Sequence, residues 1–172
     1  SKDYIVMFDL QRESQKPITI HEAIDFAGYI VLSPDNKKLA WVEWGGKNMP
    51  WEASQLWLAE VRKDGKLINK KVIAGTKSET SEKISIFQPI WCEDGSLVVS
   101  EDSSGWWNLI KSRPDLHPNQ QPFWESLWPM KAETAMPQWV YGMSTTASSR
   151  DKVYSIICSS GRWSLKLLTK DR

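Results

Sequence analysis

The fold is decided by two neighbouring stretches, DGSLVVS at residues 94–100 and SGWWNL at residues 104–109. Both recur later in the chain, as DKVYSII at residues 151–157 and SGRWSL at residues 160–165. The glycine, the second tryptophan and the leucine of SGWWNL each reappear after 56 residues. The recurrence therefore pairs an inner apolar strand with an outer one that carries tryptophan.

An earlier copy reads LAWV at residues 39–42 and LWLA at residues 56–59, after the turn SPDN at residues 33–36. Leu39 precedes Leu97 by 58 residues. A repeat of this length, built from short strands and turns, is typical of a propeller or another repeat array. We predict an all-β fold, a partial β-propeller of about three four-stranded antiparallel blades plus the outer strands of a preceding blade.

The repeat also divides the chain into blades. Residues 1–20 are expected to end a blade, and residues 21–76, 84–124 and 133–172 to form one blade each. Asn36 suits the left-handed position of the first turn. Five of the nine prolines fall between residues 114 and 137, which predicts an irregular connection because proline removes ladder donors.

Composition excludes several classes of protein. The 172 residues carry a net charge of +1, so no basic surface for nucleic acid is indicated. No apolar run is long enough for a membrane span, and no metal-ligand spacing of Cys or His occurs. Cys92 and Cys158 fall in different blades, too far apart to bridge, which favours free thiols and a cytoplasmic location. No cofactor is expected.

Three blades and a fragment do not close a ring, since propellers typically have about 4–8 blades. An open arc exposes the faces between blades, and large exposed apolar faces are rare in monomers. We therefore expect either that the chain is a piece of a longer protein or that the arc self-associates. A start in the middle of a blade favours the first.

Four stretches together resemble the propeller of prolyl oligopeptidase-family serine peptidases. They are LSPDNKKLAWVEW at residues 32–44, NMPW at 48–51, FQP at 87–89 with SSGWWNL at 103–109, and PQWVYGMS at 137–144. The resemblance is greatest to the acylaminoacyl-peptidase and dipeptidyl-aminopeptidase-like branch. Asn36 stands where that family usually has glycine, and Cys92-Glu93 where it usually has Ser-Pro.

The resemblance implies a two-domain parent protein in which a propeller covers an α/β-hydrolase domain that cleaves short peptides. We expect that domain to be absent from this chain, because no Gly-x-Ser-x-Gly motif occurs. The partners it implies are the missing hydrolase domain and, through the parent, a peptide substrate. The chain alone is expected to have no peptidase activity.

No catalytic residue is assigned. His21 and His117 are the only histidines, and neither has a nucleophile partner that the sequence indicates, so both are expected in loops or on the surface.

Glu43 and Trp44 end one inner strand, and the repeat aligns them with Glu101-Asp102 at the end of another. Glu43, Trp44 and Glu101 are candidate substrate-binding residues, because acidic groups at a propeller mouth could bind the amino terminus of a peptide. The competing interpretation, which we favour, is that these acidic groups cap hairpins and face water.

Trp106 and Trp107 could form a stacking platform. Because Trp107 recurs in the repeat, a wedge between blades is the favoured interpretation. Three functional hypotheses stay open: a non-catalytic, substrate-gating propeller segment of a serine peptidase; a stand-alone protein-interaction scaffold without activity; and a carbohydrate-binding module that uses exposed Trp44, Trp51 or Trp106.

Overall fold

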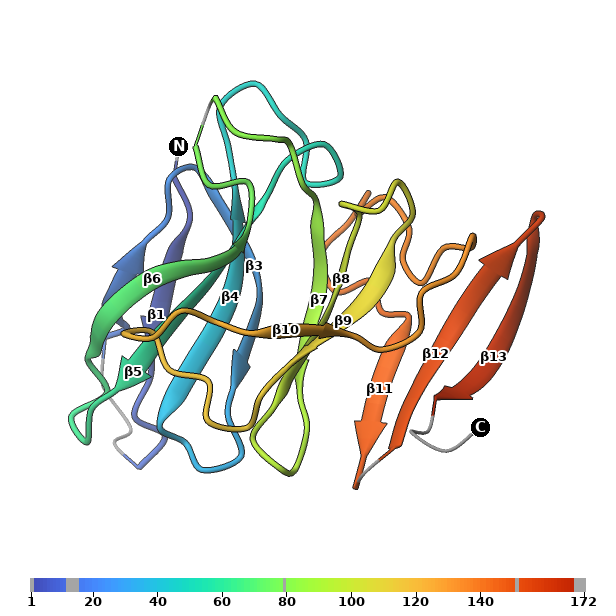
Figure 1. Cartoon of the computed structure of the whole chain (residues 1–172). Coiled ribbons are helices and arrows are strands. Elements are labelled where there is room, and N and C mark those ends of the chain that lie inside the picture. Colours follow the sequence, from blue (N-terminus) through green and yellow to red (C-terminus); the bar gives the residue numbers. More distant parts are fainter. Residues whose placement is uncertain (1, 12–15, 79, 151, 169–172) are drawn as a thin grey trace.

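The computed structural model describes residues 2–11, 16–78, 80–150 and 152–168, and it folds them into four antiparallel sheets (Figure 1). The first sheet contains β1 (Tyr4–Met7) and β2 (Ile18–Glu22). The second contains β3 (Phe26–Leu32), β4 (Lys38–Trp44), β5 (Gln55–Val61) and β6 (Leu67–Gly75). The third contains β7 (Ile86–Trp91), β8 (Leu97–Glu101), β9 (Asn108–Ser112) and β10 (Trp124–Ser126). The fourth contains β11 (Thr146–Ser149), β12 (Lys152–Ser159) and β13 (Arg162–Leu168).

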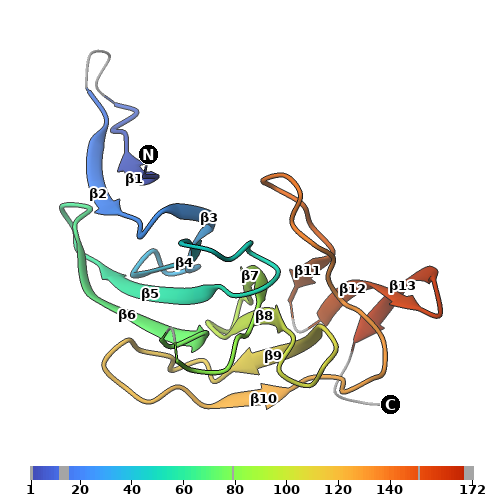
Figure 2. The same cartoon turned by 90° about the horizontal axis from the view of Figure 1, so that it is seen from above.

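The four sheets fan out around one side of the molecule, each following its neighbour in chain order (Figure 2). Strands β3, β7 and β11 begin their sheets and lie innermost, and β7 contacts β3, β4 and β11. The described residues contain no helix and no closed barrel. The all-β, partial-propeller prediction is therefore confirmed. No helix among the described residues is suited to crossing a membrane.

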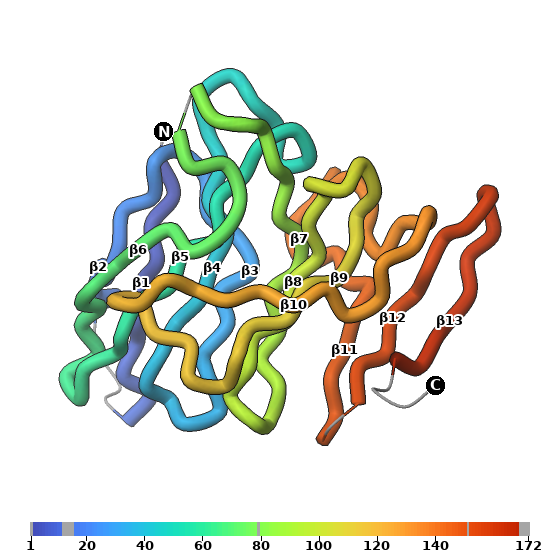
Figure 3. The backbone as a smooth tube through the Cα atoms, in the orientation of Figure 1, coloured from blue at the N-terminus to red at the C-terminus, as the bar shows by residue number. Residues whose placement is uncertain are grey.

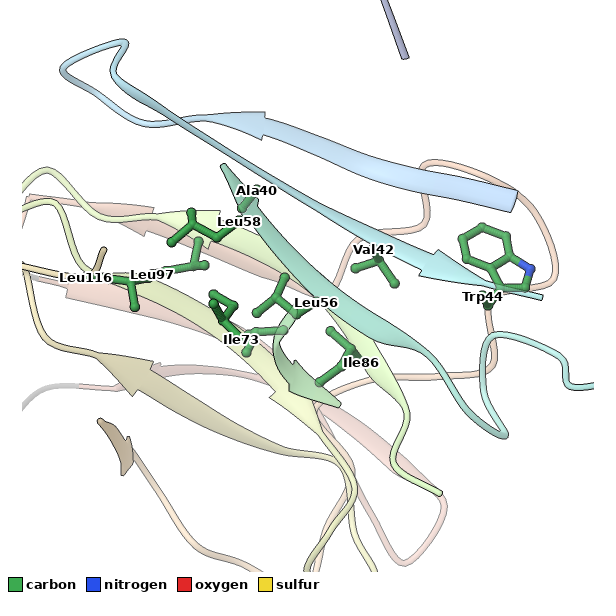
Figure 4. Packing of buried hydrophobic residues seen from close by; sticks show 10 residues of the cluster. Ala40, Val42, Trp44, Leu56, Leu58, Ile73, Ile86, Leu97 and Leu116 are labelled. Atoms are coloured by element: carbon green, nitrogen blue, oxygen red, sulfur yellow. The ribbon is translucent and has the colours of Figure 1, made fainter. Parts of the chain in front are cut away.

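Apolar side chains between consecutive sheets hold the fan together. The largest cluster joins the second and third sheets, and Figure 4 shows Ala40, Val42, Leu56, Leu58 and Ile73 against residues of the third sheet. Strand β4 separates two layers, because successive side chains of a strand point to opposite faces. Ala40, Val42 and Trp44 face the third sheet, whereas Leu39 and Trp41 pack against Ile5 of the first.

The fourth sheet is joined to the third in the same way. Val153, Ile157 and Leu168 pack against Val98 and Leu109. None of the described residues covers the opposite face of this sheet, on which Trp163, Leu165 and Leu167 are 48%, 71% and 46% exposed. The repeat relates Trp163 to Trp107, but Trp107 is nearly buried, in a cluster with Ala135 and Met143 of the tract that follows β10.

The turns follow the sequence closely. Asn36 has a φ of 58° in the turn before β4, as expected from its tolerance of the left-handed region. Gly105 has a φ of 83° in the hairpin before β9. Both thiols are free, with Cys92 buried and Cys158 half-buried.

Two details differ from the sequence-based description. The first sheet runs to Glu22, because β2 pairs with β1 rather than opening the next sheet. The fourth sheet has three described strands, and its first strand begins only at Thr146. The tract before it, residues 127–145, belongs to the long irregular course between β9 and β11 that Figure 3 traces across the molecule.

Candidate functional site

Glu43 is a buried structural carboxylate. Its side chain points from β4 toward the first sheet and has no exposed surface. His21 Nε2 of β2 lies 2.5 Å from Glu43 Oε1, Trp41 Nε1 donates to the same oxygen at 2.6 Å, and the Ile24 amide donates to Oε2 at 2.9 Å. The expectation that Glu43 caps a hairpin in water is therefore wrong, because these donors draw the carboxylate between two sheets.

The surroundings of Glu43 determine its ionisation. Burial alone would raise its pKa, but hydrogen bonds from His21, Trp41 and Ile24 outweigh burial, so the pKa lies below the ordinary value of 4.5. The ring of His21 packs against Trp41 and Trp57, with centroids 4.9 and 5.9 Å away. Glu43 thus ties the first sheet to the second as an ionised group.

His21 is also buried, contrary to the expectation of a loop or surface position. Its Nε2 faces Glu43, and its Nδ1 lies 3.4 Å from Lys70 Nζ of β6. A protonated lysine can only donate, so Nδ1 is the acceptor and Nε2 carries the proton toward Glu43. Both ring nitrogens are occupied, and neither faces a hydroxyl or thiol. His117 lies in a loop as expected, with Nε2 3.3 Å from Glu60 Oε1.

Trp44 lies on the other face of β4 and belongs to an aromatic cluster. Its ring stacks on Phe26 at 5.9 Å and lies 5.8 Å from the ring of Tyr141. Gly28 allows this approach, since a Cβ there would be 3.3 Å from the Trp44 ring and 3.5 Å from that of Tyr141. The Tyr141 hydroxyl donates to Asp3 Oδ2 at 3.0 Å.

A second aromatic pair lies beside the first. The rings of Trp51, from the β4–β5 connection, and Trp139 are 4.5 Å apart. We call the five residues Phe26, Trp44, Trp51, Trp139 and Tyr141 the aromatic rim. Its outer part is the loop of residues 137–143, which reaches from the start of the fourth sheet toward the second (Figure 2).

Sequence reasoning missed the rim because it placed all of residues 133–172 in one blade. A usable signal was present: residues 134–149 contain no Asp, Glu, Lys, Arg or His. A sixteen-residue tract without charge that carries Trp139, Val140 and Tyr141 together is unusual for an outer strand, where polar residues alternate with apolar ones.

Two residues of the innermost strands hold the segment that follows the rim. Tyr29 of β3 donates its hydroxyl to the Met143 carbonyl at 2.8 Å. Gln88 of β7 accepts from the Thr145 and Thr146 amides at 2.7 and 3.0 Å and donates to the Thr146 carbonyl at 2.6 Å. Both lie at bulges with positive φ, 52° for Tyr29 and 47° for Gln88. Burial raises the pKa of Tyr29, so its hydroxyl stays protonated.

Glu101 behaves as the favoured interpretation predicts. Its two carboxylate oxygens accept from the Ser103 amide at 3.0 Å and from the Ser103 hydroxyl at 2.8 Å, which caps its own hairpin. Neighbouring Asp102 accepts from the Ser85 amide at 2.7 Å, and burial raises its pKa. The structure thus engages Glu43 and Glu101 in separate internal contacts, and peptide binding by Glu43, Trp44 and Glu101 stays a prediction.

Trp107 is the predicted wedge. It is nearly buried, stacks on Phe87 of β7 at 6.1 Å, and belongs to a cluster that includes Tyr29 of the second sheet and Met143 before the fourth. Trp106, next to it, remains partly exposed.

A cavity of about 600 Å³ adjoins the rim at Trp44. Among its lining residues are Asp25, whose Oδ2 accepts from the Gly46 amide at 2.7 Å, and Lys83, whose Nζ donates to Asn48 Oδ1 at 2.8 Å. The face that carries the rim therefore offers apolar rings beside groups of both charges. Such a combination suits a ligand with apolar side chains and a polar backbone.

No family model matches the chain, and no curated protein matches it. Solved structures do. A puromycin hydrolase is 29% identical over 83% of this chain and 20% of its own, with a TM-score of 0.72. A puromycin-hydrolyzing peptidase of Mycobacterium tuberculosis is 27% identical over 88% of this chain and 21% of its own, with a TM-score of 0.75. Prolyl oligopeptidase B from Galerina marginata shares the fold at 12% identity, covering 97% of this chain and 22% of its own with a TM-score of 0.67.

The radial sheets and these likenesses define the class, a partial β-propeller. These likenesses support the resemblance to a propeller segment of the prolyl oligopeptidase family that the sequence stretches indicated. It spans about a fifth of the length of the solved structures it matches.

Proposed function

We propose that this chain is a non-catalytic, substrate-gating propeller segment of a serine peptidase that acts on short peptides. The likeness to the corresponding part of puromycin hydrolase, at 29% identity and a TM-score of 0.72, carries this proposal. The nucleophile and its base would belong to a hydrolase domain outside residues 1–172.

A gate needs rigidity more than reactive groups, and the contacts between the sheets supply it. The first sheet is fixed to the second through Glu43 and His21. Gln88 and Tyr29 fix the segment before β11 to the third and second sheets. Sheets held in this way exclude a folded protein by shape, while a short or extended peptide passes.

The gating role is tested by exchange. A chimera would carry residues 1–172 in place of the matching segment of puromycin hydrolase. We expect it to cleave a short fluorogenic peptide and to leave intact a folded protein that displays the same peptide in a surface loop. A matched chimera with Glu43→Ala and Gln88→Ala, which loosens the sheets, should lose this discrimination. If the unmodified chimera cleaves both substrates equally, the segment does not gate.

We also propose that the isolated arc self-associates through its uncovered face. On the fourth sheet, Leu165 is the most exposed apolar residue of β13 at 71%, and Trp163 and Leu167 point to the same face. The first sheet exposes Tyr4 and Val6 at the other end of the fan. Apolar faces of this kind are normally covered by a partner sheet.

A further inference from the structure

We propose that the aromatic rim binds a bulky aromatic side chain of the peptide, with Trp139 as the principal contact. This inference rests on the proposed function and adds the class of substrate to it. It starts from exposure, since Trp139, Val140 and Tyr141 are 72%, 65% and 59% exposed. Single exposed apolar residues are ordinary, but three consecutive ones beside Phe26 and Trp51 form a patch of the kind that marks a binding surface.

The exposed rings are held in place. Trp139 packs against Trp51 at 4.5 Å, and Tyr141 contacts Trp44 and donates its hydroxyl to Asp3. The segment that follows is anchored through the Met143 carbonyl to Tyr29. Aromatic side chains with fixed positions lose little conformational entropy when a ligand arrives, so such a surface is preorganised for binding.

The charge around the rim selects the kind of ligand. Residues 134–149 carry no ionisable group except Tyr141, and residues 48–51 carry none. Burial and the contact with Asp3 raise the pKa of Tyr141, so its phenol is neutral as well. A surface of neutral rings favours an aromatic side chain, which gains offset-stacked or edge-to-face contacts, over a charged or small one.

Two buried polar groups point to a peptide rather than a purely apolar partner. Within the described residues, Trp107 Nε1 and Gln138 Oε1 are buried and have no hydrogen-bond partner. Trp107 packs against Ala135 and Met136, two residues before Gln138 in the same tract. One group is a donor and the other an acceptor, the complement of the C=O and N–H of a peptide unit.

The test uses the whole 172-residue chain and calorimetric titration with three capped pentapeptides: Gly-Phe-Gly-Phe-Gly, Gly-Ser-Gly-Ser-Gly and Gly-Lys-Gly-Glu-Gly. We expect measurable binding of the first only, weakened about tenfold or more by Trp139→Ala, since each 1.4 kcal/mol is a factor of ten. Trp163→Ala, which removes a half-exposed tryptophan near the start of β13 in the fourth sheet, is the matched control and should change affinity less than about twofold. Val140→Ser, which replaces the exposed apolar residue between Trp139 and Tyr141 and leaves all ring contacts intact, provides a second variant should Trp139→Ala unfold.

Several results would overturn the inference. Equal affinity for the Phe and Ser peptides would remove the aromatic preference, and an equal loss in Trp163→Ala would remove the location. Trp139-dependent binding of cellohexaose without peptide binding would assign the rim to carbohydrate. Trp139-dependent self-association without peptide binding would assign it to a second copy. These titrations need no hydrolase domain, so they test peptide binding independently of the chimera that tests gating. Binding without gating would leave the rim proposal standing and remove the proposed function, and gating without binding would do the opposite.

Discussion

Replacing Glu43 by alanine should cost a large part of the stability of the chain. The substitution removes the acceptor of three donors, the buried side chains of His21 and Trp41 and the part-buried amide of Ile24. An unsatisfied buried donor costs about 1–3 kcal/mol, and more when its partner was ionised. The three donors share one site, so their separate costs overlap. We therefore expect a loss of about 3–5 kcal/mol in the free energy of unfolding, the lower part of the sum of the three separate costs.

Urea unfolding at pH 7, followed by tryptophan fluorescence, measures this loss. Small domains have about 5–15 kcal/mol in total, so Glu43→Ala should move the midpoint far toward zero urea. Glu43→Gln keeps the volume and one acceptor and should lose less. Glu22→Ala is the control, since Glu22 is the exposed neighbour of His21 on β2 and pairs with Lys2 at the surface. A Glu43→Ala midpoint equal to that of Glu22→Ala would refute the buried-carboxylate account.

Three further outcomes are expected. The difference in unfolding free energy between the unaltered chain and Glu43→Gln should be full above about pH 5 and shrink as pH falls below the ordinary pKa of 4.5. The reason is that the Glu43 carboxyl has a lower pKa in the folded chain than in the unfolded one, so its stabilisation is lost on protonation. A pH-independent difference would contradict this prediction. Gln88→Ala should cost about 2–4 kcal/mol by urea unfolding, because two backbone amides lose their acceptor, and a loss under about 1 kcal/mol would show that water replaces it. Leu165→Thr with Leu167→Thr should shift sedimentation toward the monomer at high protein concentration, and an unchanged profile would place any association elsewhere.

The strands were predictable because two signals agreed at each of them. Residues 56–59 were expected to form a strand from their place in the repeat, and they lie within β5. Asn36 and Gly105 marked turns by their tolerance of positive φ, and both adopt it. The order of strands within each sheet could therefore be predicted from local sequence, because consecutive strands in a meander pair with their neighbours.

The candidate site was less predictable, because burial of polar groups depends on which sheet faces which. From sequence alone Glu43 is expected at the surface. It is buried because β2 places His21 against it, a contact between residues 22 positions apart that no local sequence pattern predicts. His21 was misplaced for the same reason. The aromatic rim could be predicted only by knowing that residues 137–143 form a loop and not a strand. The absence of charged residues in this tract was the available signal for that loop.

Tyr29 and Gln88 combine two opposed demands at single positions. A left-handed backbone disfavours side chains with a Cβ, by about 1–2 kcal/mol per residue, and glycine would relieve that cost. Glycine would also release the carbonyl and amides of residues 143–146 that these side chains hold. A glycine at either position would therefore relieve backbone strain but release residues 143–146 from the innermost strands. We expect these two positions to tolerate a substitution only when the new side chain can still make the hydrogen bond.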